Sequence, residues 1–412
     1  MEKYKLSELI VIKNGRDHKD LPNGDYPVFG SGGIMRYVNS YLYDKPSVLL
    51  PRKGSLSNIQ YSDTPFWTVD TLYYTEINEE LVSPYYLYRY LRLLDMSRLD
   101  SGTGVPSMTF DSYYNINVFL PNIEEQRRVA SILQKIDAKI ALNHQINDNL
   151  EAMAKQLYDY WFVQFDFPNE EGKPYKSSGG AMVWNEKLKR EIPQGWSDCV
   201  LGDYIGRITN GLNPRKNFVL GSGNNYYVTI RSLVGTTIDW NNCDRCDDEA
   251  LSKINSRSQL QIGDIIFSAI GTIGRTYYIL EEPTNWNISE TSFTLRAKEN
   301  VPNDFFYGML RSNEIQIKAD KAAMGSTLRC LVMDSLCSLQ YIKIPSYMMK
   351  LFAAKVSPLY RQIHRNNKEI AELTKQRDEL LPLLMNGQAS VNYHLSSLSR
   401  NIPFKALYYF AI

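Results

Sequence analysis

The sequence predicts an α+β fold of two similar domains joined by two long antiparallel coiled-coil helices, in a pseudo-two-fold arrangement. Three observations support this prediction. Patterns of the first half return in the second half, each copy ends in an apolar run that meets a proline, and a heptad pattern follows each proline. The chain has 412 residues, of which 43% are hydrophobic, so it can form more than one core.

The repeat is visible at several points in the same order along the chain. Residues 6–15 correspond to residues 201–211, and both stretches end in Asn-Gly. The run 49–56 corresponds to 266–273, where an apolar segment reaches a glycine followed by Ser or Thr. Apolar runs that stop at such turns are typical of strands, so two copies of one α+β domain are expected.

After the closing prolines, Pro121 and Pro345, the apolar period changes from two residues to about three and a half. A 4-3 alternation runs from Val129 to Trp161 and again from 352 to 384, and each position of the second series lies 223 residues after its counterpart. This is a heptad seam, and roughly 38 helical residues at ~1.5 Å each form a rod of ~57 Å. One small domain cannot cover such a rod, so the two helices are expected to pack on each other.

The register of an antiparallel pair can be sought by matching the two seams. Pairing residues whose numbers add up to 513 matches both series and places Asn147 opposite Asn366. Two buried amides can satisfy each other, whereas an amide facing leucine would cost on the order of 1–3 kcal/mol. The same register places Arg377 opposite Ile136, so Arg377 is expected to extend outward along its stem.

Composition excludes several classes of function. The net charge is +1, so any nucleic-acid contact must come from local clusters. Neither a signal peptide nor a run of ~18 apolar residues is present, which predicts a soluble cytoplasmic protein. The five cysteines are scattered, and the Cys243/Cys246 spacing has no second pair, so neither disulfides nor a metal site are expected.

Catalytic motifs are also missing. The glycine-rich residues 29–33 lack the spacing of a methyl-donor or dinucleotide loop, and no GxxxxGK[ST] loop occurs. A turn between strands is the favoured interpretation of 29–33. No catalytic residue, no metal and no bound cofactor are therefore expected in this chain.

Several short motifs, taken in their order, resemble the specificity subunits of type I restriction-modification systems. The resemblance covers residues 1 to about 387. Its most specific pieces are Asn-Gly at 14–15 followed by YPVFGSGG at 26–33, LPNIEEQRRVASIL at 120–133, WFVQFDFP at 161–168 and IPQGW at 192–196.

The resemblance implies two target-recognition domains, each recognising one half of a split, asymmetric site in double-stranded DNA. It also implies two methyltransferase subunits on the helices and restriction subunits in the complex, with S-adenosylmethionine, ATP and Mg bound by those partners. We expect the first recognition domain to span residues 1–121, the first helix 122–163, a linker 164–196, the second recognition domain 197–345 and the second helix 346–386. Residues 387–412 form a tail to which the sequence assigns no role.

DNA contacts are expected from polar loops that combine Arg or Lys with Gly, Ser, Thr and Asn. In the first copy the candidates are Arg16, Lys19, Ser31, Arg36, Arg52, Lys53, Thr103 and Ser107, and in the second they are Asn213, Arg215, Lys216, Arg231, Ser268, Thr272, Arg275, Thr327 and Arg329.

Two alternatives stay open at this point. The chain could be the recognition part of a fused methyltransferase-endonuclease, although a recognition domain that starts at Met1 and the missing catalytic motifs weigh against it. It could also be a coiled-coil scaffold without a DNA role, which would leave the duplicated domains unexplained.

Overall fold

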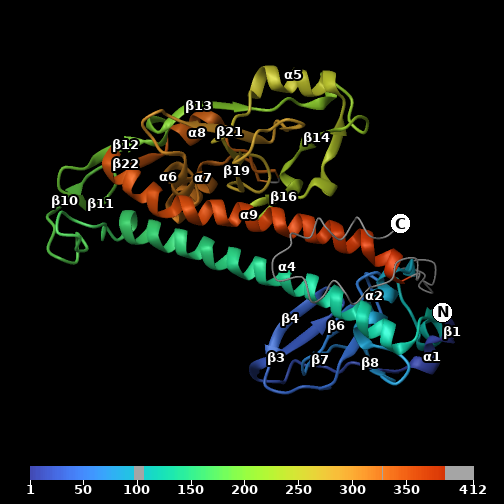
Figure 1. Ribbon diagram of the computed structural model, residues 1–412. Coiled ribbons are helices and arrows are strands. Elements are labelled where there is room, and N and C mark those ends of the chain that lie inside the picture. Colours follow the sequence, from blue (N-terminus) through green and yellow to red (C-terminus); the bar gives the residue numbers. More distant parts are fainter. Residues whose placement is uncertain (97–105, 327, 386–412) are drawn as a thin grey trace, which may run out of the picture. The chain divides into compact units, whose positions relative to one another are not determined.

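The computed structural model describes residues 1–96, 106–326 and 328–385. These residues divide into two compact units: 1–96, 106–141 and 371–385 form one, and 142–326 and 328–370 form the other. Each unit contains one copy of the repeat and a part of both long helices, α4 and α9 (Figure 1). The fold is thus mixed α/β with long helices.

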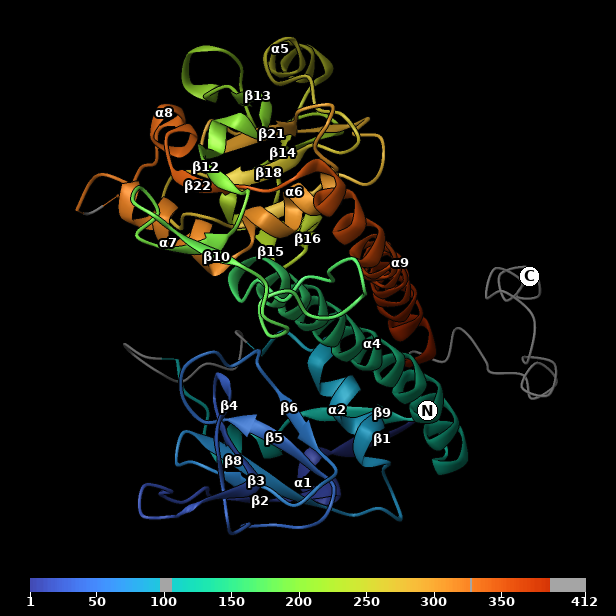
Figure 2. The ribbon, with the colours of Figure 1, turned by 90° about the vertical axis from the view of Figure 1, so that its left-hand side faces the viewer.

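The first copy is built on a sheet with the strand order β2-β8-β5-β6, in which neighbours are antiparallel. Beside it, β3 pairs antiparallel with β4 and parallel with β7, while β1 pairs with β9. Helix α2 packs on β5 and β6, between the sheet and α4 (Figure 2). The bounds are β1 (Glu2–Lys5), α1 (Leu6–Leu9), β2 (Ile10–Lys13), β3 (Asn23–Gly30), β4 (Gly33–Val38), β5 (Ser47–Pro51), β6 (Gln60–Ser62), β7 (Trp67–Thr68), β8 (Leu72–Ile77), α2 (Pro84–Leu93), α3 (Phe110–Tyr114) and β9 (Asn117–Leu120).

The second copy repeats this topology. Its main sheet has the order β13-β21-β18-β19, β14 pairs antiparallel with β17 and parallel with β20, and β12 pairs with β22. Helix α6 occupies the place of α2, and α8 that of α3. The bounds are β12 (Ser197–Val200), η3 (Leu201–Asp203), β13 (Ile205–Asn210), η4 (Pro214–Lys216), β14 (Asn225–Val228), η5 (Ile230–Ser232), β17 (Asp244–Cys246), β18 (Ile265–Ser268), β19 (Thr276–Tyr278), β20 (Trp286–Ile288), β21 (Ser292–Ala297), α6 (Asn303–Leu310), α8 (Met333–Cys337) and β22 (Gln340–Lys343).

Some elements of the second copy have no counterpart among the described residues of the first. They widen the loops around the shared sheet and leave its strand order unchanged. They include β15 (Leu233–Val234), β16 (Thr237–Ile238), η6 (Trp240–Asn242), α5 (Asp248–Ser258) and α7 (Asn313–Ala322).

Residues 164–196 join the first long helix to the second copy, but they are folded and do not form the linker that their composition suggested. Phe165 and Phe167 are each 3% exposed and lie in the core of the second unit. Phe167 stacks on Tyr175 and Trp196, at 4.7 and 5.0 Å between ring centroids. The aromatic side chains bury apolar area, which outweighs the polar composition around them. The segment also contains a hairpin of β10 (Met182–Asn185) and β11 (Arg190–Pro193).

The two long helices are α4 (Ile123–Tyr158), which continues into the π-helical segment η2 (Asp159–Val163), and α9 (Ser346–Met385). Within the first unit, Val129 and Leu133 of α4 share a hydrophobic cluster with residues near the end of α9. Such apolar contacts satisfy the heptad seam on which the helix prediction rested.

Within the second unit, the helices run antiparallel and bury amides against each other. Asn366 Nδ2 donates to Asn147 Oδ1 (2.8 Å), and Asn147 Nδ2 donates to Asn367 Oδ1 (2.8 Å). Asn143, at 1% exposure, donates to Glu369 (2.8 Å). Asn147 and Asn366 therefore lie opposite each other, at the place that the 513 register assigns to them.

The expectation that Arg377 extends outward is wrong. Its side chain is 20% exposed, and its guanidinium donates to Asp137 (2.9 Å) and Asp378 (2.8 Å). The seam pattern predicted Ile136 as the neighbour but could not show that the carboxylate beside it points to Arg377. Among the described helices, none combines the length and the apolarity that a membrane span requires.

The register can be tested with engineered cysteines. Asn147→Cys and Asn366→Cys, in a background with the native cysteines replaced, should crosslink under mild oxidation faster than Ile140→Cys with Asn366→Cys. The second pair is displaced by one heptad, about 10 Å along the helix axis, which exceeds the reach of a disulfide. Crosslinks are measured as a mobility shift on denaturing gels. Faster oxidation of the 140/366 pair would show that the register is wrong.

Candidate nucleic-acid interface

In the first copy, several loops meet at one edge of the sheet, where β2, β3, β5 and β7 end and β8 begins. Backbone hydrogen bonds join neighbouring loops. The amide of Arg16 donates to Thr68 O (2.8 Å), and the amide of Val69 donates to Phe29 O (3.0 Å). We call this surface the first loop edge; it comprises residues 14–18, 30–33, 52–58, 67–71 and 106–109.

Three of the sequence candidates come together on this edge. The amide of Arg52 donates to Thr71 O (2.9 Å), and Lys53 forms an antiparallel bridge with Ser107. The Lys53 side chain is exposed, and it makes no ion pair with a residue that the structure describes. Arg52, Lys53 and Ser107, which are far apart in the sequence, thus form one ridge.

Ser31 and Arg16 lie on the same edge. Ser31 O accepts a hydrogen bond from Asn58 Nδ2 (2.6 Å), and a Cβ added at Gly54 would lie 3.6 Å from the Ser31 hydroxyl. Arg16 has an exposed side chain, while its carbonyl accepts a hydrogen bond from Trp67 Nε1 (2.9 Å). The backbone of both residues is held, so their side chains project from a defined position.

Lys19 and Arg36 lie outside the first loop edge. Lys19 is exposed and reaches only Asp17, at 4.0 Å, a distance at which an exposed pair contributes little. Arg36 donates to Leu21 O (2.8 Å) and Asn23 (2.9 Å), so its guanidinium is occupied within the β3–β4 hairpin. The sequence pattern could not distinguish such structural cations from exposed ones.

The second copy carries an equivalent edge, held by the same kind of backbone bonds. The amide of Gly271 donates to Arg329 O (2.8 Å), and that of Ser289 to Val228 O (2.9 Å). We call this surface the second loop edge; it comprises residues 211–217, 228–233, 269–275, 288–291 and 329–331.

The Asn-Gly pair that the repeat analysis detected has a physical reason in both copies. A Cβ added at Gly15 would lie 2.1 Å from Val69 O, and one added at Gly211 would lie 1.8 Å from Ile288 O. Any side chain would overlap the neighbouring backbone at these positions. Glycine is therefore required where each loop edge begins.

At the second loop edge, Asn213 is the centre of a small polar cluster. Its Oδ1 accepts from the amide of Arg215 (3.0 Å), and its Nδ2 donates to Glu290 (2.8 Å). Tyr227 donates its hydroxyl to the other Glu290 oxygen (2.9 Å), and burial together with this bond raises the pKa of Tyr227. The tyrosine stays a neutral donor, and the Arg215 side chain is exposed.

The turn after β18 uses part of its polar groups internally. Ser268 is buried, donates to Thr272 O (2.6 Å) and accepts from the amide of Arg275 (2.7 Å), so its hydroxyl offers nothing to a ligand. The Arg275 guanidinium donates to two carbonyls of the loop 230–233, which also carries the exposed Arg231. Thr272, Arg231 and Arg275 are exposed, but the guanidinium of Arg275 is partly occupied by these carbonyls.

Arg329 lies at the second loop edge, but its guanidinium forms an ion pair with Asp320 (2.9 Å). Thr103 and Thr327 lie outside the described residues, as does the side chain of Lys216.

Sequence reasoning missed several polar residues at these edges. Gln60 donates to Gly30 O (2.8 Å), next to the bond of Asn58, and together they shape the turn that carries Ser31. Glu290 was also missed. It lies 220 residues after Asp70, and each is followed by Thr, so an acidic residue recurs at one place of the repeat. A full internal alignment could have found it.

The loop edges present chemistry for recognition. Exposed amides, hydroxyls and cations on fixed loops can donate to or accept from base edges and phosphates.

Within the described ranges, no group of three His, Cys, Asp or Glu could hold a metal ion. Burial raises the pKa of the Cys199 thiol to about 11, so this cysteine is protonated and a poor nucleophile.

Comparisons with known proteins agree with this geometry. Residues 1–152 match the family model described as the type I restriction modification DNA specificity domain. The chain is 25% identical over 390 residues to the type I restriction enzyme MjaIX specificity subunit of Methanocaldococcus jannaschii, with 90% of this chain and 86% of that protein covered. It is 24% identical to the HindI specificity subunit of Haemophilus influenzae, with 76% and 79% covered.

A solved structure shows a similar fold. The crystal structure of a type I restriction-modification S subunit from M. genitalium matches with a TM-score of 0.61 and 17% identity, covering 93% of this chain and 95% of that chain. The sequence resemblance is thus confirmed by the comparisons with relatives and accompanied by a similar fold.

The glycine requirement leads to a stability prediction. Gly15→Ala and Gly211→Ala should each destabilise the protein by about 1–3 kcal/mol, because the new methyl group forces the backbone apart. Gly32→Ala is the matched control, because an added Cβ there meets nothing within 4 Å. The thermal midpoint of each variant is the measurement. Equal midpoints for Gly15→Ala and Gly32→Ala would contradict the close approach.

Proposed function

We infer that this chain, which is similar over 90% of its length to the MjaIX specificity subunit, is itself a specificity subunit and recognises a DNA site in two separate parts. One loop edge would contact each part. We call the two copies, 1–121 and 197–345, the first and second recognition domains. The proposal includes no covalent chemistry by this chain.

The observation that carries the proposal is the equivalence of the two loop edges. The bond from Gly54 N to Pro106 O (2.9 Å) has its counterpart in that from Gly271 N to Arg329 O (2.8 Å). One scaffold therefore displays loops at the same place in both copies. A pair of similar surfaces suits a ligand with two similar parts, as duplex DNA has.

The side chains on the two scaffolds differ, which favours unequal half-sites. Lys53 and Ser107 of the first ridge have Ile270 and Cys330 at the equivalent bridge of the second. Where hydrogen-bonding groups differ, the base edges that satisfy them differ too. The complete site should therefore be asymmetric.

The remaining parts of the proposal concern the complex. We expect the helices α4 and α9 to form an antiparallel coiled coil that holds the domains in a pseudo-two-fold arrangement and binds two methyltransferase subunits, with restriction subunits added. S-adenosylmethionine, ATP and Mg would be bound by these partners, in the cytoplasm. The net charge of +1 supports weak DNA binding by the isolated chain, because non-specific affinity rests on cationic contacts to phosphates.

An exchange of one domain tests independent recognition. Replacing residues 197–344 by the matching part of a relative should change the bases recognised in one half of the site and leave the other half unchanged. The modified sites are mapped by sequencing methylated DNA from cells that express the complex. Changes in both halves would refute independent recognition by the two domains.

Lys53 provides a test of the first loop edge. If Lys53 contacts a DNA phosphate, Lys53→Ala should weaken DNA binding by the assembled complex several-fold. The slope of log affinity against log salt concentration should then decrease by the amount expected for about one phosphate contact. Lys19→Ala removes an exposed cation outside the edge and should leave both unchanged. Affinity is measured by fluorescence anisotropy at several salt concentrations. Equal losses for the two variants would place the DNA elsewhere.

A further inference from the structure

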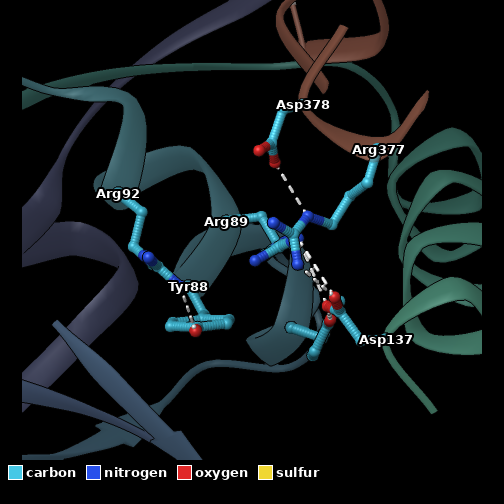
Figure 3. A network of polar contacts seen from close by, with 7 residues as sticks. Tyr88, Arg89, Arg92, Asp137, Arg377 and Asp378 are labelled. Atoms are coloured by element: carbon cyan, nitrogen blue, oxygen red, sulfur yellow. Dashed lines mark hydrogen bonds and ion pairs between the residues drawn. The ribbon is translucent and has the colours of Figure 1, made fainter. Parts of the chain in front are cut away.

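A partly buried ionic network connects the first recognition domain with both long helices (Figure 3). Asp137 of α4 accepts a hydrogen bond from the hydroxyl of Tyr85 on α2. Its carboxylate also binds two guanidinium groups, that of Arg89 on α2 (3.2 Å) and that of Arg377 on α9 (2.9 Å). One carboxylate thus holds three donors from two other helices.

The charges of this network balance. Arg89 is only 4% exposed, and its guanidinium lies over the rings of Tyr85 and Tyr88. Arg377 has Asp378 as a second partner (2.8 Å), so one buried and one partly exposed cation meet two carboxylates. Without Asp137, Arg89 would be left buried beside no carboxylate that the structure describes. Because such a charge requires its partner, the network has one favourable geometry.

The network adds an attachment of a different kind from the apolar contacts. The first recognition domain continues directly into α4 at Ile123, and Asp137 lies 14 residues further along the helix, at a distance of about 21 Å. A domain held at one point can rotate about it, and apolar packing is not directional. An ionic contact well away from that point restricts the rotation.

The second unit contains a similar arrangement. Tyr307 and Arg311, four residues apart like Tyr85 and Arg89, face helix α4. Arg311 donates to Tyr307 (2.7 Å) and to Glu151 (2.5 Å). Burial alone would lower the pKa of Arg311, but the interactions with Tyr307 and Glu151 raise it above its usual value. Glu151 follows Asp137 by two heptads in the sequence.

We propose that Asp137 and Glu151 are positioning residues for DNA recognition: each fixes the orientation of one recognition domain on the helix pair, and together they restrict the length of the unspecified gap that the complex accepts between its two half-sites. The inference rests on the proposed function. Neither residue needs to contact DNA or to change which bases are recognised.

The test compares assembled complexes of this chain with its methyltransferase partner. Cells express the complex with the wild-type chain, Asp137→Asn, Glu151→Gln or the control Lys135→Gln, which changes one exposed charge on the same helix. Methylated adenines are mapped by sequencing genomic DNA. Wild type and Lys135→Gln should modify sites of a single gap length. Asp137→Asn and Glu151→Gln should methylate sites with one base pair more or less at least ten times as often, with unchanged bases in both halves.

Tyr85→Phe is a milder variant of the same network, which is expected to fold even if Asp137→Asn does not. It removes one neutral donor to Asp137 and keeps the ion pairs of Asp137 with Arg89 and Arg377. It should raise the frequency of methylation at sites with an altered gap length by a smaller factor than Asp137→Asn does. Variants that assemble and lower the melting temperature but keep the wild-type gap would overturn the proposal, as would altered bases in either half. If wild type itself shows no split site, the proposed function fails instead, so the two failures are distinguishable.

Discussion

A polar group buried between two helices needs a partner, and this requirement decides how α4 and α9 meet. Leucine and isoleucine seams fit together at many offsets, because apolar contact has no direction. The amides of Asn147 and Asn366 fit at one offset, where each finds the other or a neighbour. Asp137 and Arg377 add an ionic contact in the first unit. The polar positions therefore specify the pairing, while the apolar positions supply most of the stability.

In the recognition domains, the residues that form the sheet differ from the loop residues that are available to a ligand. In both copies the main sheet has an equivalent strand order, and a glycine lies beside a carbonyl at the start of each loop edge. Side chains on the loops, such as Lys53 in one copy and Asn213 in the other, are not needed for the strand order. Loops of this kind can change while the sheet persists, which is how one scaffold can recognise different sequences.

The sequence predicted what is periodic or repeated. The two copies, the long helices and the Asn147–Asn366 pairing follow from patterns that local spacing makes visible. Contacts between distant segments were missed. Phe165 and Phe167 fold a polar segment into a core, Arg36 is occupied by carbonyl and amide oxygens, and Ser268 is buried within its turn. A list of polar loop residues contains both exposed and occupied groups, and only coordinates distinguish them.

The central claim, that each recognition domain contacts one part of a split site, is tested most directly by mapping methylated adenines in DNA from cells that express the complete, unaltered complex. The account predicts one motif with two specified parts of different sequence, separated by an unspecified gap of constant length. A continuous motif, or one whose halves are identical inverted copies, would contradict it.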